Sequence, residues 1–332
     1  MTDRFSPPSY RPPLPFRSGH VQTIWPTLFR QVEDVAYRRE RLELADGDFL
    51  DLDWLGDERQ RVAIVAHGLE GSANRSYVRG MARELHRHGW SVCAWNLRGC
   101  SGEPNRLLRA YHSGATEDLD AVVGYVLREG PRQVAVVGFS LGGNLTLKWL
   151  GEQGESLDPR ITAGAGVSVP VDLAGSADAM RAWSRQIYMR YFLRKLVRKV
   201  EEKAARFDGA PDPSPAGSMT SFAQFDGHFT APVHGFASAE DYWERSSSLP
   251  WLPHIRVPTL LLNAQDDPFL SPSCFPRQLA ETLPHLHLVT PPYGGHVGFV
   301  QANGPYYSET VVADFLDAFS SVSSRSAPPS TA

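Results

Sequence analysis

The chain has 332 residues, of which 42% are hydrophobic and 21% are charged, close to the average of soluble globular proteins. This composition excludes a disordered, collagen-like or coiled-coil chain and leaves enough apolar surface for one large core. The chain has 33 basic and 37 acidic side chains and a formal net charge of −4, so its bulk charge predicts no nucleic-acid partner.

The three cysteines, Cys93, Cys100 and Cys274, are too few for a disulfide framework, and none has the spacing of a zinc site. The N-terminal sequence MTDRFSPPSYRPPLPF lacks the basic and apolar regions of a signal peptide. No run of 18 apolar residues predicts a membrane span. We therefore expect a cytoplasmic protein, and its oligomeric state stays open.

The first segment, residues 1–34, is rich in proline and aromatic residues and shows little periodicity. We expect it to form an extended arm packed on the body rather than a domain. At the other end, residues 323–332 consist of Ser, Ala, Pro, Arg and Thr, which predicts a disordered tail.

Between these ends, apolar runs of strand length alternate with segments of helical spacing. The Asp46-Gly47 pair predicts a hairpin turn between strands at 38–45 and 48–55. Further strands are expected at 62–66, 91–95, 133–137, 161–169, 259–263 and 287–290, with helices at 76–88, 115–129 and 141–153. This alternation predicts an α/β fold whose central sheet is mostly parallel and is covered by helices on both faces.

Residues 172–251 interrupt the alternation, because helical patterns and Pro/Gly/Ser loops replace clear strands. We expect a helical cap inserted into a core of residues 35–171 and 252–322, above the strand ends where ligands of α/β sheets bind. Within it, residues 181–206 carry nine Lys/Arg and two Glu among aromatic side chains. This segment is either a cap helix with solvated charges or a peripheral membrane contact.

The sequence Gly138-Phe139-Ser140-Leu141-Gly142 follows the buried run VAVV and opens a helical pattern. A strand–turn–helix context of this kind is typical of a nucleophile elbow, with Ser140 as the nucleophile. The amide of Leu141 would then face a developing oxyanion. The alternative is an ordinary glycine-rich turn with a capping serine.

A serine nucleophile needs a base and an orienting acid, which follow it in this architecture in the order Asp/Glu, then His. The run TLLLN leads to Asp266 and Asp267, and His296 follows the last predicted strand between glycines. The Ala-x-x-Asp-Pro pattern favours Asp267 as the acid and leaves Asp266 to brace the loop. His296 is the candidate base, although a surface-loop histidine is the simpler interpretation.

The second oxyanion donor is expected after the strand at 62–66, in His67-Gly68-Leu69-Glu70. Gly68 permits a tight turn, and the amide of Leu69 is the candidate donor. His67 is expected to brace this loop. An ordinary glycine-containing loop between a strand and a helix remains the alternative.

Six strings together resemble the YheT-type branch of the α/β-hydrolase superfamily, which is related to ABHD1/2/3-like proteins and to yeast medium-chain fatty-acid ester enzymes. The strings are SGHVQTIWP (18–26), HGLEGS (67–72), NLRGCSGEPNR (96–106), YHSGATEDL (111–119), GFSLGGN (138–144) and NAQDDPF (263–269). The resemblance covers residues 14–318 and places the family triad on Ser140, Asp267 and His296. The motif GHVQT (19–23) gains no role from it beyond docking on the body.

The resemblance implies an α/β-hydrolase fold and a serine carboxylic-ester hydrolase. Its substrates would be small-molecule acyl esters or lipids with short to medium chains, and the reaction requires no metal or organic cofactor. Acyltransferase or thioesterase activity is the nearest alternative within the family. A non-catalytic binding protein on the same fold is the alternative from another class.

Overall fold

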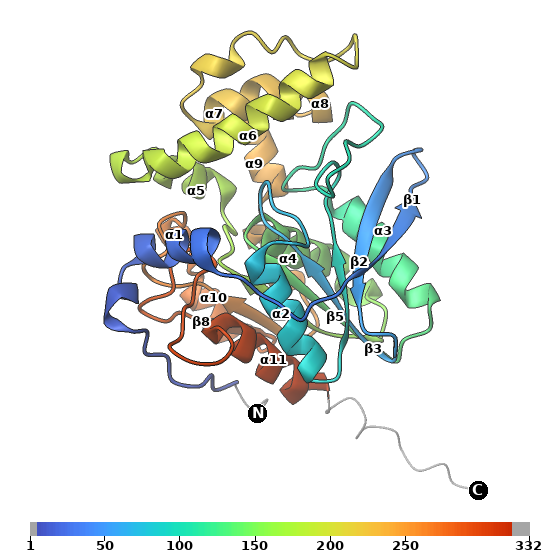
Figure 1. Ribbon diagram of the computed structural model, residues 1–332, viewed down its shortest axis with the longest axis vertical. Helices are drawn as coiled ribbons and strands as arrows, with labels where there is room; N and C mark the ends of the chain where they lie inside the picture. Colours follow the sequence, from blue (N-terminus) through green and yellow to red (C-terminus); the bar gives the residue numbers. More distant parts are fainter. Residues whose placement is uncertain (1–4, 321–332) are drawn as a thin grey trace, which may run out of the picture.

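The computed structural model describes residues 5–320 and contains one eight-stranded sheet among them, in the order β1-β2-β4-β3-β5-β6-β7-β8 (Figure 1). The leading hairpin is antiparallel, and β2 also pairs antiparallel with β4, whereas all later pairs are parallel. The strands are β1 (Arg38–Glu43), β2 (Phe49–Leu55), β3 (Arg61–Ala66), β4 (Ser91–Trp95), β5 (Gln133–Phe139), β6 (Ile161–Val167), β7 (Thr259–Leu262) and β8 (Leu286–Val289). The mostly parallel α/β sheet that the sequence predicts is confirmed.

Two apolar layers sandwich this sheet, because successive side chains of a strand point to opposite faces. On β3, Val62 and Ile64 join one layer and Ala63 and Val65 the other, all fully buried. The first layer is completed by α3 (Thr116–Arg128), α4 (Leu141–Gln153) and α10 (Arg277–Thr282), and the second by α2 (Ser76–Arg87) and α11 (Tyr307–Ser320). This core fixes the carboxyl ends of the strands, where the loops of interest begin.

From its sequence we expected the N-terminal arm to be extended. The structure shows that part of it is helical. It forms a short turn, η1 (Leu14–Phe16), and an eleven-residue helix, α1 (Gly19–Phe29), which contains Pro26. Its side facing the body consists of Gly19, Gln22, Thr23 and Pro26, all buried. The sequence analysis missed this helix because its buried stripe is polar and small, and because proline usually interrupts helices.

Between β6 and β7 the chain forms the helices that lie above the sheet in Figure 1. They are α5 (Leu173–Ala179), η3 (Trp183–Arg185), α6 (Gln186–Ala204), η4 (Ala216–Ser218), α7 (Phe222–Phe225), the π-helical turn η5 (Asp226–Thr230), α8 (Ala231–His234) and α9 (Ala239–Ser246). They enclose an apolar cluster of their own, which includes Met189, Phe225 and Phe229. We propose that residues 172–251 form a cap.

The remaining short helices are η2 (Gly154–Ser156), η6 (Leu249–His254) and η7 (Pro272–Cys274). Among the residues that the structure describes, no helix combines the length and the apolar composition needed to cross a membrane. The predicted disordered tail, residues 323–332, lies outside the described residues.

Candidate active site

Ser140 stands at the sharp turn from β5 into α4, with φ 53° and ψ −119°, a conformation that side-chain-bearing residues rarely adopt. Two glycines permit this turn. A Cβ at Gly138 would lie 2.2 Å from the Gly142 carbonyl oxygen, and a Cβ at Gly142 would lie 2.5 Å from that of His67. Small residues two positions before and after the serine are therefore a steric requirement of the turn.

The structure brings Ser140, Asp267 and His296 together at the carboxyl edge of the sheet. The Ser140 hydroxyl lies 2.9 Å from His296 Nε2, and His296 Nδ1 lies 2.9 Å from Asp267 Oδ2. Asp267 follows β7 and His296 follows β8, as the sequence predicted for their loops. In this arrangement Nδ1–H donates to the carboxylate, which leaves Nε2 to accept the serine proton.

The pair of His296 and Asp267 is shielded from water. The two residues are 6% and 5% exposed, and the imidazole stacks on Phe269 with ring centroids 4.1 Å apart. Asp267 Oδ1 also accepts a hydrogen bond from the Phe269 amide at 2.9 Å. Because the carboxylate is held on both oxygens, it fixes the rotamer of the imidazole and the tautomer that it carries.

Asp266 does not contact the imidazole. Its Oδ1 accepts a hydrogen bond of 2.9 Å from the Gly295 amide, immediately before His296. Burial raises the pKa of Asp266, and the negative charge of Asp267 adds to this. The geometry thus gives the two adjacent aspartates the different positions that the sequence analysis assigned to them.

The amides of Leu69 and Leu141 flank the serine. Leu141 opens α4, so its N–H has no acceptor within the helix. The loop of Leu69 crosses directly over Ser140, since a Cβ at Gly68 would lie 3.0 Å from the serine Cβ. Among the described residues no hydrogen bond engages either amide, so both are available to an oxyanion bound at Ser140.

His67 braces this loop from inside. It is fully buried, and burial lowers its pKa to about 4, so the ring is neutral. The Leu97 amide donates to its Nε2 at 3.1 Å, which leaves Nδ1–H to donate to the Gly68 carbonyl at 2.8 Å. Both ring nitrogens are used in holding the backbone.

The comparisons with known proteins identify the family and agree with the fold. Residues 63–302 match the model of the family described as alpha/beta hydrolase fold. The chain belongs to the α/β-hydrolase family. The hydrolase is also 38% identical over 293 residues to YheT of Escherichia coli, provisionally named an esterase, which covers 86% of this chain and 85% of that protein. The resemblance drawn from the motifs is thereby confirmed.

More distant relatives and solved structures agree. The human phospholipase ABHD3 is 27% identical over 324 residues, covering 93% of the hydrolase and 79% of ABHD3. The structure of the Pyrococcus furiosus esterase Pf2001 superimposes with a TM-score of 0.58 at 17% identity, covering 95% of the hydrolase and 99% of that chain. At 17% identity, the similarity to the Pf2001 structure shows a shared fold and nothing further.

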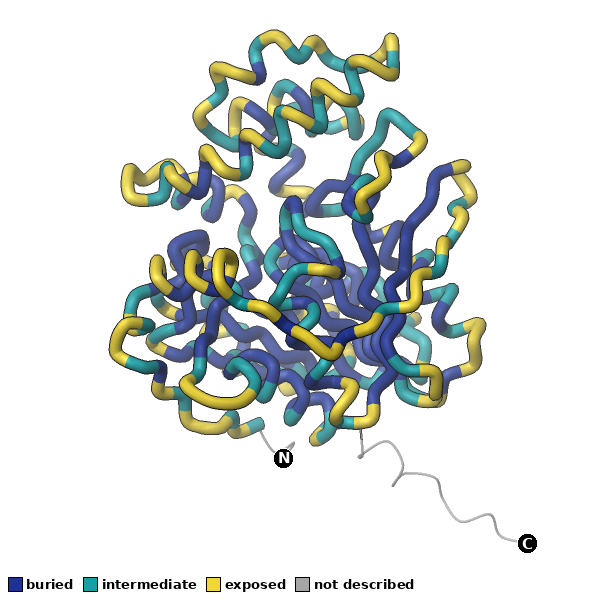
Figure 2. Tube along the Cα trace, viewed as in Figure 1, coloured by how far each residue is buried: buried dark blue, intermediate teal, exposed yellow. Residues whose placement is uncertain are grey.

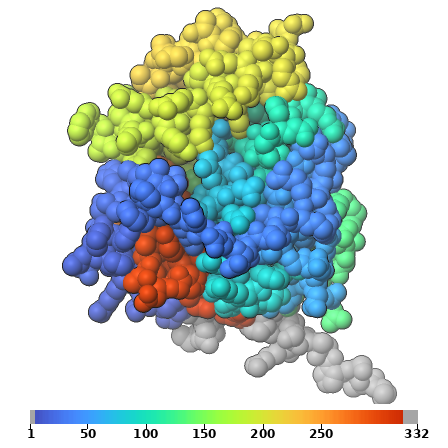
Figure 3. All heavy atoms as spheres, in the orientation of Figure 1, coloured from blue at the N-terminus to red at the C-terminus, as the bar shows by residue number. Residues whose placement is uncertain are grey.

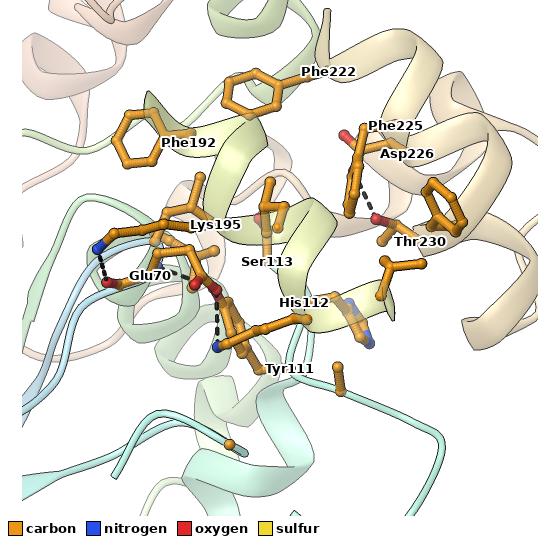
Figure 4. Close-up of a pocket in the computed structure, with 18 of the residues that line it drawn as sticks. Glu70, Tyr111, His112, Ser113, Phe192, Lys195, Phe222, Phe225, Asp226 and Thr230 are labelled. Atoms are coloured by element: carbon orange, nitrogen blue, oxygen red, sulfur yellow. Dashed lines mark hydrogen bonds and ion pairs between the residues drawn. The ribbon is translucent and has the colours of Figure 1, made fainter. Parts of the chain in front are cut away.

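Glu70 next to the oxyanion loop was not selected from the sequence, although it lies in the quoted string HGLEGS. It has φ 53°, its amide donates to the Tyr111 hydroxyl at 3.0 Å, and that hydroxyl donates to its carboxylate at 2.5 Å. Lys199 of the cap helix α6 pairs with the same carboxylate at 2.9 Å, and Lys195 donates to the Glu70 carbonyl at 3.3 Å (Figure 4). The cap of the hydrolase is thus bound to the loop that carries Leu69.

The arm motif GHVQT also has a position at the site that the sequence analysis missed. Thr23 Oγ1 accepts a hydrogen bond of 2.9 Å from the His296 amide and donates one of 2.7 Å to the Gly19 carbonyl. A Cβ at Gly19 would lie 1.9 Å from the Asp266 carbonyl oxygen, so only glycine fits there. The arm therefore packs directly on the two loops that carry the acid and the histidine.

Two further residues of the motif extend this support. Gln22 is fully buried, accepts a hydrogen bond from the Val300 amide at 2.8 Å and donates to the Phe16 carbonyl at 2.7 Å. His20 Nδ1 lies 2.8 Å from the Tyr188 hydroxyl of α6. The arm therefore links the histidine loop to the cap.

A cavity of about 770 Å³ opens onto Ser140 and His296 between the body and the cap. On the cap side its wall includes Phe229 and the aromatic side chains of Phe192, Phe222 and Phe225 (Figure 4). Charged side chains of α6, such as Lys195 and Lys199, line another part of the cavity. A pocket of this volume accommodates a small organic ligand, and its aromatic wall favours an apolar chain.

Asp226 places a carboxyl group beside the aromatic side chains of the wall. Asp226 accepts a hydrogen bond from the Thr230 hydroxyl at 2.7 Å (Figure 4). It accepts a second from the Trp243 indole at 2.9 Å. Burial raises its pKa to about 6, above the usual range of aspartate. Its charge is therefore maintained at a cost to the folded state.

Proposed function

We propose that the hydrolase is a serine carboxylic-ester hydrolase that acts through an acyl-enzyme on Ser140. The observation that carries this proposal is the chain of two 2.9 Å contacts from Ser140 through His296 to Asp267, at the wall of an apolar cavity. Each group has the partner that its part in acyl transfer requires.

Acylation begins when His296 Nε2 takes the proton of Ser140 as Oγ attacks the ester carbonyl carbon. The carbonyl oxygen becomes an oxyanion, which the amides of Leu69 and Leu141 receive. As the intermediate collapses, the carbon–oxygen bond to the alcohol breaks. His296 returns the proton to the leaving alkoxide, and the acyl group stays on Ser140.

Deacylation repeats these steps with water. His296 takes a proton from the water as the water oxygen attacks the acyl carbon. The bond between the acyl carbon and Ser140 Oγ then breaks. The proton then returns to Ser140, and the carboxylic acid leaves. An acceptor alcohol or thiol in place of water would give acyl transfer, and acyl thioesters would enter by the same first step.

The substrates that we propose are short- to medium-chain acyl esters or lipids. The aromatic wall of Phe192, Phe222, Phe225 and Phe229 supports an apolar acyl chain. The names of relatives support the same class, namely a yeast monoacylglycerol lipase and the yeast medium-chain fatty acid ethyl ester synthase/esterase 2, 30% and 29% identical to this chain.

A chain-length series of p-nitrophenyl esters tests this proposal. We expect kcat/KM to be highest for chains of about six to ten carbons, and Ser140→Ala to lower turnover by roughly 10⁴- to 10⁶-fold. Ser184→Ala, at an exposed serine of the cap, is the matched control and should leave turnover unchanged. A clear preference for acetyl esters, or full activity of Ser140→Ala, would contradict it.

A further inference from the structure

The large apolar side chains that are exposed in the described part of the chain lie in two segments. Within residues 5–320, all nine large hydrophobic residues that are exposed lie in residues 14–29 of the arm or residues 183–191 of the cap. Trp183 is 91% exposed, Leu28 66% and Ile187 65%. Single exposed apolar residues are ordinary, but a gathering of this kind marks an interaction site.

Helix α1 buries its polar side and exposes its apolar side, which is the reverse of an ordinary surface helix. Its buried stripe is polar and small, whereas Val21, Ile24, Trp25 and Leu28 recur at helical spacing on its solvent side. The hydrogen bonds of Gln22 and Thr23 fix this orientation. Because these hydrogen bonds hold the polar side of α1 against the body, the apolar stripe faces the solvent.

The second stripe lies on the cap. Trp183, Ile187 and Tyr191 follow one another at intervals of four residues and are all exposed. The two stripes are neighbours, because the rings of His20 and Tyr188 stack in parallel with centroids 5.8 Å apart. Figure 2 shows exposed residues on α1 and on the start of α6, and Figure 3 shows arm and cap touching there.

The two sequence segments that carry these stripes contain charged side chains of one sign. Residues 5–32 contain three arginines and no acidic residue, and residues 180–200 contain seven basic residues and no acidic one. Arg190 and Arg194 are exposed, and among the described residues no carboxylate pairs with either of them. A chain with a net charge of −4 thus concentrates positive charge beside its exposed apolar stripes.

We infer that α1, η3 and the first half of α6 form a docking face for an anionic lipid surface. Tryptophan and aliphatic side chains flanked by arginine are the composition of helices that lie in a membrane interface. On the same helix α6, Phe192 and Lys195 line the cavity. Docking would therefore place the cavity beside the lipid, within reach of esters that dissolve there.

Binding to vesicles tests this face without any turnover, so its failure is separate from failure of the proposed hydrolysis. We expect the wild type and Ser140→Ala to bind vesicles of phosphatidylcholine with phosphatidylglycerol more tightly than vesicles of phosphatidylcholine alone. Binding should weaken as salt is raised. Leu28→Ser combined with Trp183→Ser should weaken binding at least tenfold, and both positions are exposed enough to leave folding intact.

A charge series provides the matched control. Arg190→Gln with Arg194→Gln should weaken binding roughly 25-fold, since each basic residue near the surface contributes about fivefold. Arg128→Gln with Arg132→Gln, exposed positions at the end of α3 and just before β5, should change little. Equal losses in both pairs would overturn the inference. So would absence of vesicle binding together with a dimer that Leu28→Ser and Trp183→Ser dissociate.

Discussion

Asp266 and Asp267 are adjacent carboxyl groups with different surroundings. Asp267 contacts His296 Nδ1, whereas Asp266 accepts a hydrogen bond from the loop backbone at Gly295. A residue that holds the imidazole tautomer affects the chemical step, and a residue that holds a loop affects it only through position. The same Asp→Asn substitution at each of these two positions therefore compares the two roles within one loop.

We expect Asp267→Asn to lower kcat by roughly 10⁴-fold, because the amide cannot hold the tautomer with Nε2 free to accept a proton. Asp266→Asn should lower kcat by less than about tenfold, since its oxygen can still accept from Gly295. Ester-hydrolysis kinetics of the two variants measure this difference. Equal losses would contradict the assignment of Asp267.

Thr23 offers a test of the arm. Thr23→Val keeps the shape of the side chain but leaves the buried amide of His296 without its acceptor. We expect a loss of about 1–3 kcal/mol in the free energy of unfolding and a fall of roughly tenfold in kcat with little change in KM. Thr27→Val, one turn later and exposed, is the control. An unchanged kcat in Thr23→Val would show that the arm does not position the histidine.

At the level of elements, the sequence predicts the sheet and the helices α2, α3 and α4 well. Buried parallel strands such as 62–66 and 133–137 are continuous apolar runs, and the actual strands, Arg61–Ala66 and Gln133–Phe139, differ from them by two residues at most. The turn at Ser140 is predicted equally well, because local steric contacts require the glycines of its sequence motif.

Helix α1 and the support of the oxyanion loop were not predicted, for a different reason. The contacts of Gln22 with Val300 and of Glu70 with Lys199 join residues far apart in the chain. No periodicity reports such pairs, and the buried stripe of α1 is polar. The motifs at 19–23 and 67–72 mark these two segments as unusual. They do not indicate which distant residues the segments contact.

The contact of α6 with the oxyanion loop leads to a prediction at this scale. Lys199→Met removes the cation beside Glu70 and so loosens the loop of Leu69. We expect kcat to fall roughly tenfold, a fraction of the 10²- to 10³-fold effect of losing an oxyanion donor outright. Arg198→Met, at the exposed neighbour on α6, should retain normal kcat. A change in KM alone would assign Lys199 to substrate binding instead.

For the whole molecule, arm, body and cap meet around one cavity, and its polar groups affect stability. Asp226 has a pKa of about 6 in the folded protein and about 4 when unfolded. The folded state therefore binds the proton more tightly, so Asp226 favours folding below pH 4 relative to pH 7. That contribution is lost as the pH rises from 4 to 6.

We accordingly expect Asp226→Asn to be more stable than the wild type at pH 7, by about 3 kcal/mol, because the amide carries no charge to desolvate. The gain should disappear as the pH falls to about 4. Denaturant unfolding of both proteins between pH 4 and pH 8 measures it. A gain that does not depend on pH would refute this origin.

The central claim is that Ser140 is the nucleophile activated by His296. Labelling with a fluorophosphonate, followed by mass mapping of the modified peptide, tests it most directly. We predict a single label on Ser140, suppressed by a competing medium-chain ester and largely lost in His296→Ala. A label on another serine, or an active protein that takes up no label, would contradict the account.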